Sequence, residues 1–479
     1  MSSLRIAVLK RDFLSAGLPT FSGGKHAFRC LARSLAAAGL RVTVLCEATP
    51  AQVMLSFVEE ASSAAGRVAL MGPERLCEGA VQFQSKGCSV VACDFKDSPG
   101  MPISMGVETV MKADPQVLFI DADELYSQKG DDDAVECWAR TLSHAVRRST
   151  AMLVILVQNV HFLPFGPAGC CRPGRHVLEL WRSAQAFFCV SQFVADYVAR
   201  WSADISCSHT PARLVSLSAF GVYGDGPFPD IGSQVSARMS DATCRPVVIM
   251  PKLSDVKGAS IFFELAAMFP QVTFVGVAGD AGRWREQRSA LENVQLQAPG
   301  DIGAVLAEGW VMLCPSIWLE AWGMVAVEGL LRGLPVLSSD AGGLPEAKLG
   351  TNYVLPVNPI QMGTAAPAPV ESAEPLNPAF ESEADLAYVS RDRASSGGAA
   401  GDAPTTPRNS TPRWGDRIVP PQDIAPWASA LRALLVPEAY SAESRLSRTK
   451  ALDHVSRGPE ALRAFIRALQ AMVEGHGGA

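Results

Sequence analysis

The stretch that decides the fold reads Pro315-Ser316-Ile317-Trp318-Leu319-Glu320-Ala321-Trp322-Gly323-Met324-Val325-Ala326-Val327-Glu328. It follows an apolar run at residues 311–314 and continues into a helical pattern that stops at Gly333. A strand that leads through a tight loop into a helix is where α/β proteins bind ligands. Glu328 belongs to a helix that is apolar almost all round, which predicts burial, and a buried carboxylate needs a partner. We therefore expect a ligand beside this segment.

The rest of the chain alternates apolar runs with amphipathic helical patterns. Two sets of strands are expected, at residues 4–9, 41–46, 117–120, 153–157 and 187–190, and at 247–250, 272–277, 311–314 and 335–338. Continuous apolar runs are typical of parallel sheets covered on both faces. Because the alternation restarts near Arg245, we predict an α/β protein with two doubly wound domains, residues 1–220 and 221–437.

Residues 361–414 interrupt this pattern. They are rich in Ala, Pro, Ser and Gly and hold too few apolar side chains for a core, which predicts a disordered insertion in the second domain. Order is expected to resume at Ile418. Two helical patterns, near residues 424–435 and 459–473, close the chain, and residues 438–479 form a separate C-terminal helical segment.

The composition limits the possible functions. The 479 residues are 48% hydrophobic and carry a formal net charge of −6, which argues against a general binder of nucleic acid or anionic membranes. The first residues do not form a signal peptide, and no apolar run approaches the ~20 residues of a membrane span. We expect a soluble, cytoplasmic protein. Its 12 cysteines include no Cys-x-x-Cys pair, so the sequence does not favour a zinc site, and Cys170-Cys171 is expected to be reduced.

Three loops that follow expected strands could bind an anion or a sugar. Gly23-Gly24 opens a helix whose free N–H groups suit an anion, although a plain strand–helix turn is the favoured reading of this pair alone. Lys252 and Lys257 could neutralise a diphosphate, or they could be solvated loop lysines. Glu320 and Glu328 could each accept two hydrogen bonds from a vicinal diol. Alternatively, Glu320 is solvated and Glu328 pairs with a basic side chain.

Two further groups follow strands of the first domain. His161 leaves the strand at 153–157 and could act at a reaction centre, or it could be satisfied within loop packing. Asp121, Asp123 and Glu124 follow the strand at 117–120, and a second acidic run covers residues 131–133. An Asp-x-Asp pair could hold a divalent cation with a nucleotide. Such short matches are frequent, so the structural interpretation is favoured over a metal site.

Several of these signals agree in order and spacing with one family. The chain resembles the GT-B glycosyltransferases of the large retaining family 4, of the group 1 type. The resemblance covers most of the chain and is strongest over residues 245–356. That part holds the Glu-x7-Glu motif, the lysine pair, Leu-Pro-Val after Gly333 and a Gly-Gly echo at 342–343. The N-terminal half matches more loosely, through Gly23-Gly24, His161 and residues 189–193.

The resemblance implies two Rossmann-like domains that face each other across a cleft, with the donor held mainly by the second. It implies that a nucleoside-diphosphate sugar is the donor and that an acceptor hydroxyl binds to the first domain. The last helix would return to the first domain. The roles it implies are diphosphate contact by Lys252 and Lys257, sugar and ribose contact by Glu320 and Glu328, backbone contact by Gly323, Met324 and Val325, and reaction-centre positions for Gly23, Gly24 and His161.

The implied reaction is retaining sugar transfer without a metal or another cofactor, in the synthesis of a glycan or a specialised metabolite. The segment at residues 162–167 resembles a subset from bacterial specialised-metabolite clusters. Three alternatives remain open: a GT-B nucleotide-sugar epimerase, a non-catalytic nucleotide-sugar-binding protein, and a GT-A enzyme that uses Asp121 and Asp123 with a metal. The sugar, the base, the acceptor and the oligomeric state are not specified by the sequence.

Overall fold

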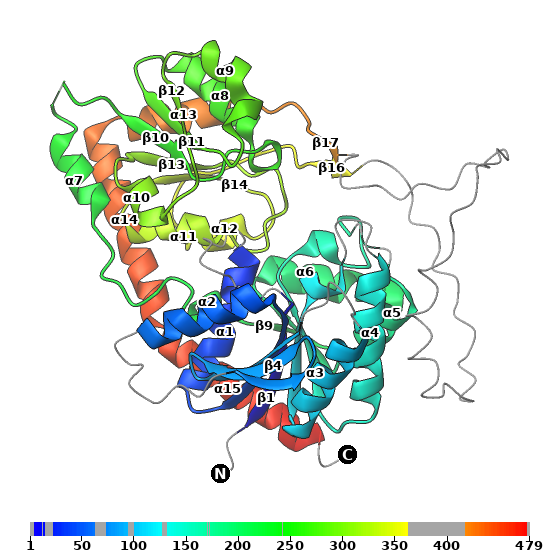
Figure 1. The fold of residues 1–479 in the computed structure, drawn as a ribbon. Helices are drawn as coiled ribbons and strands as arrows, with labels where there is room; N and C mark the ends of the chain where they lie inside the picture. Colours follow the sequence, from blue (N-terminus) through cyan, green and yellow to red (C-terminus); the bar gives the residue numbers. More distant parts are fainter. Residues whose placement is uncertain are drawn as a thin grey trace, which may run out of the picture.

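The computed structural model describes residues 4–11, 13–14, 23–62, 73–93, 100–126, 132–169, 171, 173–241, 243–362 and 417–476. Figure 1 shows two lobes, each a sheet with helices on both faces. Nearly all of the expected insertion, residues 363–414, lies outside the described residues. Asp131, Cys170 and residues 20–22, which precede the glycine pair, lie outside them as well.

The N-terminal lobe is built on a sheet of nine strands among the described residues. Their order is β3-β4-β5-β2-β1-β6-β7-β8-β9, with β3, β4 and β5 antiparallel and the other neighbours parallel. The central strands form because their apolar runs can be covered on both faces, and all six residues of β7 are buried. The strands are β1 (Arg5–Leu9), β2 (Arg41–Glu47), β3 (Glu74–Cys77), β4 (Ala80–Ser85), β5 (Cys88–Cys93), β6 (Val117–Asp121), β7 (Met152–Val157), β8 (Ala186–Cys189) and β9 (Ala212–Leu214).

The C-terminal lobe is built on a parallel sheet of six strands in the described part of the chain. Their order is β12-β11-β10-β13-β14-β15. These strands are β10 (Val247–Met250), β11 (Thr273–Val277), β12 (Val294–Gln297), β13 (Val311–Cys314), β14 (Val336–Ser339) and β15 (Val354–Leu355). A separate antiparallel pair, β16 (Gln361–Met362) and β17 (Arg417–Ile418), lies on either side of the undescribed residues 363–416.

Helices cover both sheets. Those of the N-terminal lobe are α1 (Gly23–Ala37), α2 (Pro50–Ser62), α3 (Gly100–Lys112), α4 (Asp132–Arg147), α5 (Arg175–Ser183) and α6 (Gln192–Trp201). Those of the C-terminal lobe are α7 (Ile231–Arg238), α8 (Ala259–Met268), α9 (Arg285–Ser289), α10 (Ile302–Leu306), α11 (Met324–Leu331), α12 (Leu344–Ala347) and α13 (Ala425–Leu434). No helix among the described residues is both long and apolar enough to cross a membrane.

The last two helices connect the lobes. Helix α14 (Pro437–Ser456) starts against the C-terminal lobe, where the Tyr440 hydroxyl donates to the Trp310 carbonyl at 2.9 Å. It then runs down the side of the molecule to α15 (Gly458–His476), which lies against the N-terminal lobe (Figure 1). Phe465 and Leu469 of α15 are buried in the core of that lobe. Helix α15 is therefore part of the hydrophobic core of the N-terminal lobe.

The expected strands are all present, with boundaries that differ by at most one residue at either end. Strands β3, β4, β9, β12 and β15 were not expected, because they are short or mix polar with apolar residues; β5 was also missed, although five of its six residues are buried. Helix α14 was also missed as a separate element. Its sequence has no clear apolar stripe, since it packs through small and polar side chains such as Ser444, Ser447 and Ala451.

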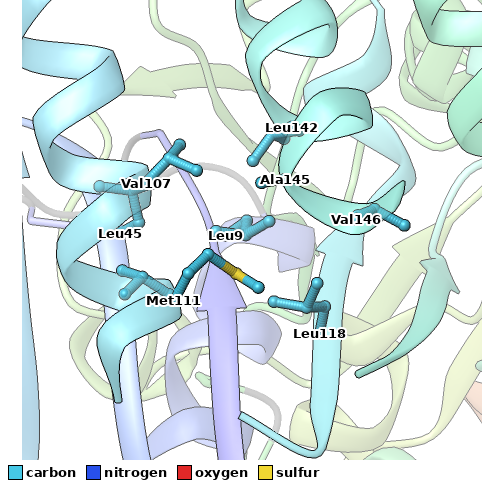
Figure 2. A pocket seen from close by; sticks show the side chains of 9 residues that line it. Leu9, Leu45, Val107, Met111, Leu118, Leu142, Ala145 and Val146 are labelled. Atoms are coloured by element: carbon cyan, nitrogen blue, oxygen red, sulfur yellow. The ribbon is translucent and has the colours of Figure 1, made fainter. Parts of the chain in front are cut away.

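Figure 2 shows a small pocket in the N-terminal lobe, between α3 and α4 on one side and β1, β2 and β6 on the other. Every side chain that lines it is apolar: Leu9, Leu45, Val107, Val110, Met111, Leu118, Leu142, Ala145 and Val146. A nucleotide or sugar site needs convergent polar groups. This pocket is therefore a packing gap in the core and not a candidate active site.

Candidate active site

The site is built where the strand order of each sheet reverses. In the C-terminal lobe, β10 lies between β11 and β13, and in the N-terminal lobe β1 lies between β2 and β6. Loops that leave neighbouring strands in opposite directions open a crevice at such a point. Lys257 follows β10 and Glu320 follows β13, so both belong to the crevice of the C-terminal lobe. Gly23 and Gly24 begin the helix that follows β1 across from them.

Lys257 and Glu320 form an ion pair in this crevice, between Nζ and Oε1. Their side chains keep 23% and 20% of their surface exposed, so both remain accessible to a ligand. Burial pushes the pKa of Glu320 upward, but the Lys257 ammonium beside it outweighs this, and the pKa lies below its usual value. Glu320 is thus held ionised by a cation, and the alternative of a solvated Glu320 is wrong.

The main chain of Glu320 is fixed by the segment that follows β14. Gly342 forms a parallel β-bridge with Glu320, and the Gly343 N–H donates to the Glu320 carbonyl at 2.6 Å. Gly342 has φ +65°, and a Cβ placed on it would lie 2.3 Å from that carbonyl oxygen. Only glycine allows this approach without strain. The Gly342-Gly343 echo therefore supports the backbone that carries the Glu320 carboxylate.

Lys252 and Glu328 complete the charged groups near the crevice. The pKa of Lys252 is lowered, first by partial loss of hydration and then by the Lys257 ammonium. Burial raises the pKa of Glu328 to about 7, although the nearby Arg332 opposes the change. Arg332 Nη1 donates to the Glu328 carbonyl at 2.9 Å, and no ion pair joins the Glu328 carboxylate to another described residue. Because Arg332 lies close enough to oppose the rise in the pKa of Glu328, the alternative of a paired Glu328 stays open.

The loop between Glu320 and α11 presents backbone donors. Gly323 caps the helix with φ +117°, and a Cβ on it would lie 2.6 Å from Leu344 Cδ2. The next residues, Met324 and Val325, contribute the first-turn N–H groups that precede the helix's own hydrogen bonds. Such groups attract anions. The start of α11 can therefore bind phosphate oxygens next to the Lys257–Glu320 pair.

The lobes meet at this point. The His161 ring, in a 3-10 turn after β7, stacks on Trp318 with centroids 3.4 Å apart and planes at 29°. Both rings are buried. A Cβ placed on Gly23 would lie 3.4 Å from the Met324 sulfur. His161 and Gly23 of one lobe thus lie against the loop of the other that carries Glu320.

The fold is shared by several solved glycosyltransferases. A glycosyltransferase from Rickettsia africae ESF-5 superimposes with a TM-score of 0.56 at 11% identity, over 99% of both chains. HepE of Anabaena in complex with UDP and glucose gives 0.56 at 14% identity, over 98% of this chain and 100% of HepE. The trehalose-6-phosphate synthase OtsA gives 0.53 at 10% identity, over 97% and 99%. These similarities confirm the expected GT-B fold.

The family comparison concerns the C-terminal lobe. Residues 244–354 match the family model described as glycosyl transferases group 1. The chain therefore has the GT-B fold, and this part of it is similar to the group 1 glycosyl transferases. No curated protein sequence matches it at a significant level. The matched range starts just before β10 and ends at the first residue of β15, so it contains Lys252, Lys257, Glu320 and Glu328.

The acidic residues after β6 form a buried network of contacts in the N-terminal lobe. Lys10 Nζ lies 2.7 Å from Asp121 Oδ2 and 2.6 Å from Glu124 Oε1, and all three side chains are buried. Gln158 Nε2 bonds the same Asp121 oxygen at 3.2 Å and the Gly24 carbonyl at 3.1 Å. No cluster of three metal-binding side chains occurs among the described residues. The favoured structural interpretation of this group agrees with these contacts.

Four residues beside the loop that carries Glu320, or at the contact between the lobes, were given no role from the sequence. Trp322 Nε1 donates to the Tyr223 hydroxyl at 2.9 Å, and the Trp322 ring stacks on His454 with centroids 5.7 Å apart. Glu346 joins the two lobes through the start of α6. The signals were weak: Tyr223 and His454 lie in segments without a motif, while Trp322 and Glu346 lie inside motifs that drew attention to their neighbours.

Proposed function

We propose that the enzyme transfers a sugar from a nucleoside-diphosphate sugar to an acceptor hydroxyl, with retention at the anomeric carbon, as in family 4. One observation carries the proposal: the Lys257–Glu320 ion pair lies at the strand-order reversal of the C-terminal sheet, in the loop region that contacts His161 and Gly23 of the other lobe. A cation and a carboxylate side by side suit a donor that joins a diphosphate to a polyhydroxyl ring.

Lys252 and Lys257 would stabilise the leaving diphosphate. Negative charge develops on it as the anomeric carbon–oxygen bond breaks, and a fixed cation is worth most where charge develops. The pKa of Lys252 is lowered by burial and, to a smaller extent, by repulsion from the Lys257 ammonium, and an anion between the two would relieve that repulsion. The N–H groups of Met324 and Val325 at the start of α11 would bind the remaining phosphate oxygens.

The two carboxylates would hold the two sugars of the donor. Glu320, kept ionised by Lys257, would accept hydrogen bonds from hydroxyls of the transferred sugar. Glu328, one helix turn further into the lobe and without an ion-pair partner among the described residues, would accept those of the ribose. Lys257 would turn from Glu320 toward the diphosphate when the donor enters, while both groups stay in the same crevice.

Gly23, Gly24 and His161 would surround the anomeric carbon. With retention, the acceptor hydroxyl attacks from the face that the diphosphate leaves. The new carbon–oxygen bond forms, the bond to the diphosphate breaks with its electron pair, and a phosphate oxygen takes the acceptor's proton. His161 would lie beside the positively charged ring as a polar group. The close approach of the lobes at Gly23 and Met324 would exclude water.

We further propose that this transfer needs no metal. The two lysines and the start of α11 supply the positive charge that a divalent cation supplies elsewhere. Asp121, the residue of the alternative metal-dependent mechanism, already shares its Oδ2 with Lys10 and Gln158. Transfer should therefore continue in excess chelator, and its loss there with recovery on added Mg²⁺ or Mn²⁺ would contradict this part.

The donor can be tested with a panel of nucleotide sugars. UDP-glucose is a reasonable first member, because HepE of Anabaena has been crystallised with it. We expect one member to raise the melting temperature and to release nucleoside diphosphate faster when a hydroxyl acceptor is present. Turnover of the sugar without any acceptor, to an isomeric nucleotide sugar, would favour an epimerase instead.

Glu320→Ala tests the assignment of the site. It should reduce transfer by about 10³-fold, because two or more hydrogen bonds to a charged group are lost. Glu264→Ala removes an exposed carboxylate from α8 in the same lobe and is the matched control, which should keep normal turnover. Near-normal transfer by Glu320→Ala would overturn the proposed function.

A further inference from the structure

Glu346 is a side chain of the C-terminal lobe that caps a helix of the N-terminal lobe. Its Oε2 accepts the Gln192 N–H at 2.7 Å and its Oε1 accepts the Phe193 N–H at 2.8 Å. Both groups belong to the first turn of α6, a helix of ten residues, whose N-cap residue Ser191 accepts from Val194 at 3.2 Å. One carboxylate from across the cleft thus satisfies two of the unpaired donors at this helix end.

The contact is of a strong kind. A carboxylate at a helix N-terminus meets the positive end of the helix dipole, and both of its hydrogen bonds are charge-assisted. The lobes are close beside it, because a Cβ placed on Gly343 would lie 3.2 Å from Ser191 Oγ. The bonds join α12 to α6, so they can exist only while the lobes are together.

The same short segment supports Glu320. The Gly343 N–H that begins α12 donates to the Glu320 carbonyl at 2.6 Å, and Gly342 forms the β-bridge with Glu320. Glu346 follows three residues later on that helix. A continuous series of contacts therefore runs from the start of α6 through Glu346 and Gly343 to the residue assigned to the donor sugar.

We propose that Glu346 is a positioning residue that couples closure of the lobes to the placement of Glu320. Closure brings the start of α6 to the Glu346 carboxylate, and the bond holds α12 and the Gly342-Gly343 backbone in the arrangement that orients Glu320. Without it, the enzyme spends more time open, water reaches the bound donor, and the oriented sugar is lost. This inference rests on the proposed function, since Glu320 is taken as the donor-sugar residue.

The first test measures closure without relying on activity. Glu346→Ala should show a larger radius of gyration by small-angle X-ray scattering than the wild type, both without ligand and with UDP. Glu346→Gln, which keeps an oxygen acceptor but loses the charge, should lie between them. It also serves as the variant if Glu346→Ala fails to fold.

Glu136→Gln is the matched control. Glu136 Oε1 accepts the His176 N–H at 2.8 Å and contacts His176 Nδ1 at 2.6 Å near the start of α5, so it has the same chemistry inside a single lobe. This variant should lose stability without a change in radius of gyration. A radius of gyration that stays at the wild-type value in both Glu346 variants would overturn the inference.

The second test separates transfer from hydrolysis. In Glu346→Ala we expect kcat/KM for transfer to fall about tenfold, the effect of losing two charge-assisted bonds. The ratio of donor hydrolysis, with water as acceptor and free sugar as product, to transfer should rise by a similar factor. An unchanged ratio would contradict the coupling. If Glu320→Ala keeps normal transfer, the proposed function fails, whatever Glu346 does; if only the Glu346 variants behave as wild type, the coupling alone fails.

Discussion

The two strand-order reversals of the molecule hold similar charges and use them differently. In the N-terminal lobe, Lys10 joins Asp121 and Glu124 with side-chain exposures of 1%, 0% and 5%. In the C-terminal lobe, Lys257 joins Glu320 with 23% and 20% of each side chain exposed. The same position in a doubly wound sheet thus carries a sealed structural cluster in one lobe and an accessible ion pair in the other. Burial, rather than residue type, distinguishes them.

The largest expected effect is on stability, in the N-terminal lobe. Lys10→Met should lower the free energy of unfolding by about 3–5 kcal/mol, because it leaves the buried Asp121 without its cation and Glu124 with Arg11 alone, at 2.8 Å. Arg5→Met removes a surface pair, Arg5 Nη2 to Asp114 Oδ2 at 2.7 Å, and should cost less than about 1 kcal/mol. Urea unfolding of the two variants measures the difference. Equal losses of unfolding free energy would contradict the view that burial makes the Lys10 cluster more important for stability than a surface ion pair.

Lys257→Met should have the opposite profile. Transfer should fall by about 10²–10³-fold, the effect typical of removing one charge-stabilising group from a reaction centre. The free energy of unfolding should change by less than about 1 kcal/mol, because the pair is partly exposed. The exposed Lys450→Met on α14 is the control. Steady-state kinetics measure the transfer rate and urea unfolding measures the stability. If Lys257→Met is unstable but active, the Lys257–Glu320 pair has a structural role and not a catalytic one.

Glu328 should give donor binding a pH dependence. Its pKa of about 7 in the free enzyme means that it is largely protonated at pH 6 and must ionise to accept ribose hydroxyls. Donor affinity should therefore weaken by up to about tenfold per pH unit below 7. Titration calorimetry of the enzyme and of Glu328→Gln measures this, and the variant should bind weakly with a flat profile.

The same group predicts the direction of a stability change. The pKa of Glu328 in the folded enzyme lies above its ordinary value of 4.5, so burial of the charged form opposes folding. Its stabilising contribution is complete below about pH 4.5 and is lost as the pH rises through about 7. Relative to Glu328→Gln, the wild type should lose unfolding free energy across this range. A difference that stays constant with pH would exclude a raised pKa.

The smallest expected effect concerns Tyr223, whose hydroxyl accepts from Trp322 at the loop next to Gly323. Tyr223→Phe should raise the donor KM by about three- to tenfold, because one hydrogen bond of about 1 kcal/mol that fixes the loop is lost. Tyr440→Phe removes another buried tyrosine bond, to the Trp310 carbonyl at 2.9 Å, away from the crevice. It should lower stability and leave the KM unchanged. Similar KM values in both variants would exclude a role for Tyr223 in the loop.

The sequence predicted the strands and helices whose apolar residues follow a regular pattern. The fully apolar β7 and β13 could be found because both faces of their strands are covered, and the Glu-x7-Glu spacing led to the helix α11. The edge strand β3 and its neighbour β4 could not, because β3 has no buried residue and β4 mixes polar with apolar residues. Helix α14 could not be predicted from an apolar stripe, because small polar side chains such as Ser444 and Ser447 are buried in its contacts.

The candidate site was predictable only within one lobe. Spacing along the chain shows that Lys257 and Glu320 follow different strands, and parallel order then brings them together. The stack of His161 on Trp318 and the bonds of Glu346 to α6 join residues about 155 positions apart in two separately folded sheets. Local patterns contain no information on how two lobes dock. The sequence therefore predicted the residues of each lobe that line the crevice better than the contacts between the two lobes.

The return of α15 to the N-terminal lobe has a consequence for folding during synthesis. Phe465 packs against Phe119 and Phe188, with ring centroids 6.0 and 5.0 Å away, and both partners are made hundreds of residues earlier. The first lobe must therefore wait, with part of its core uncovered, until the last helix leaves the ribosome. Contacts of such long sequence separation form late and slowly. The C-terminal lobe, which needs nothing beyond α14, can complete its core before the lobe that was synthesised first.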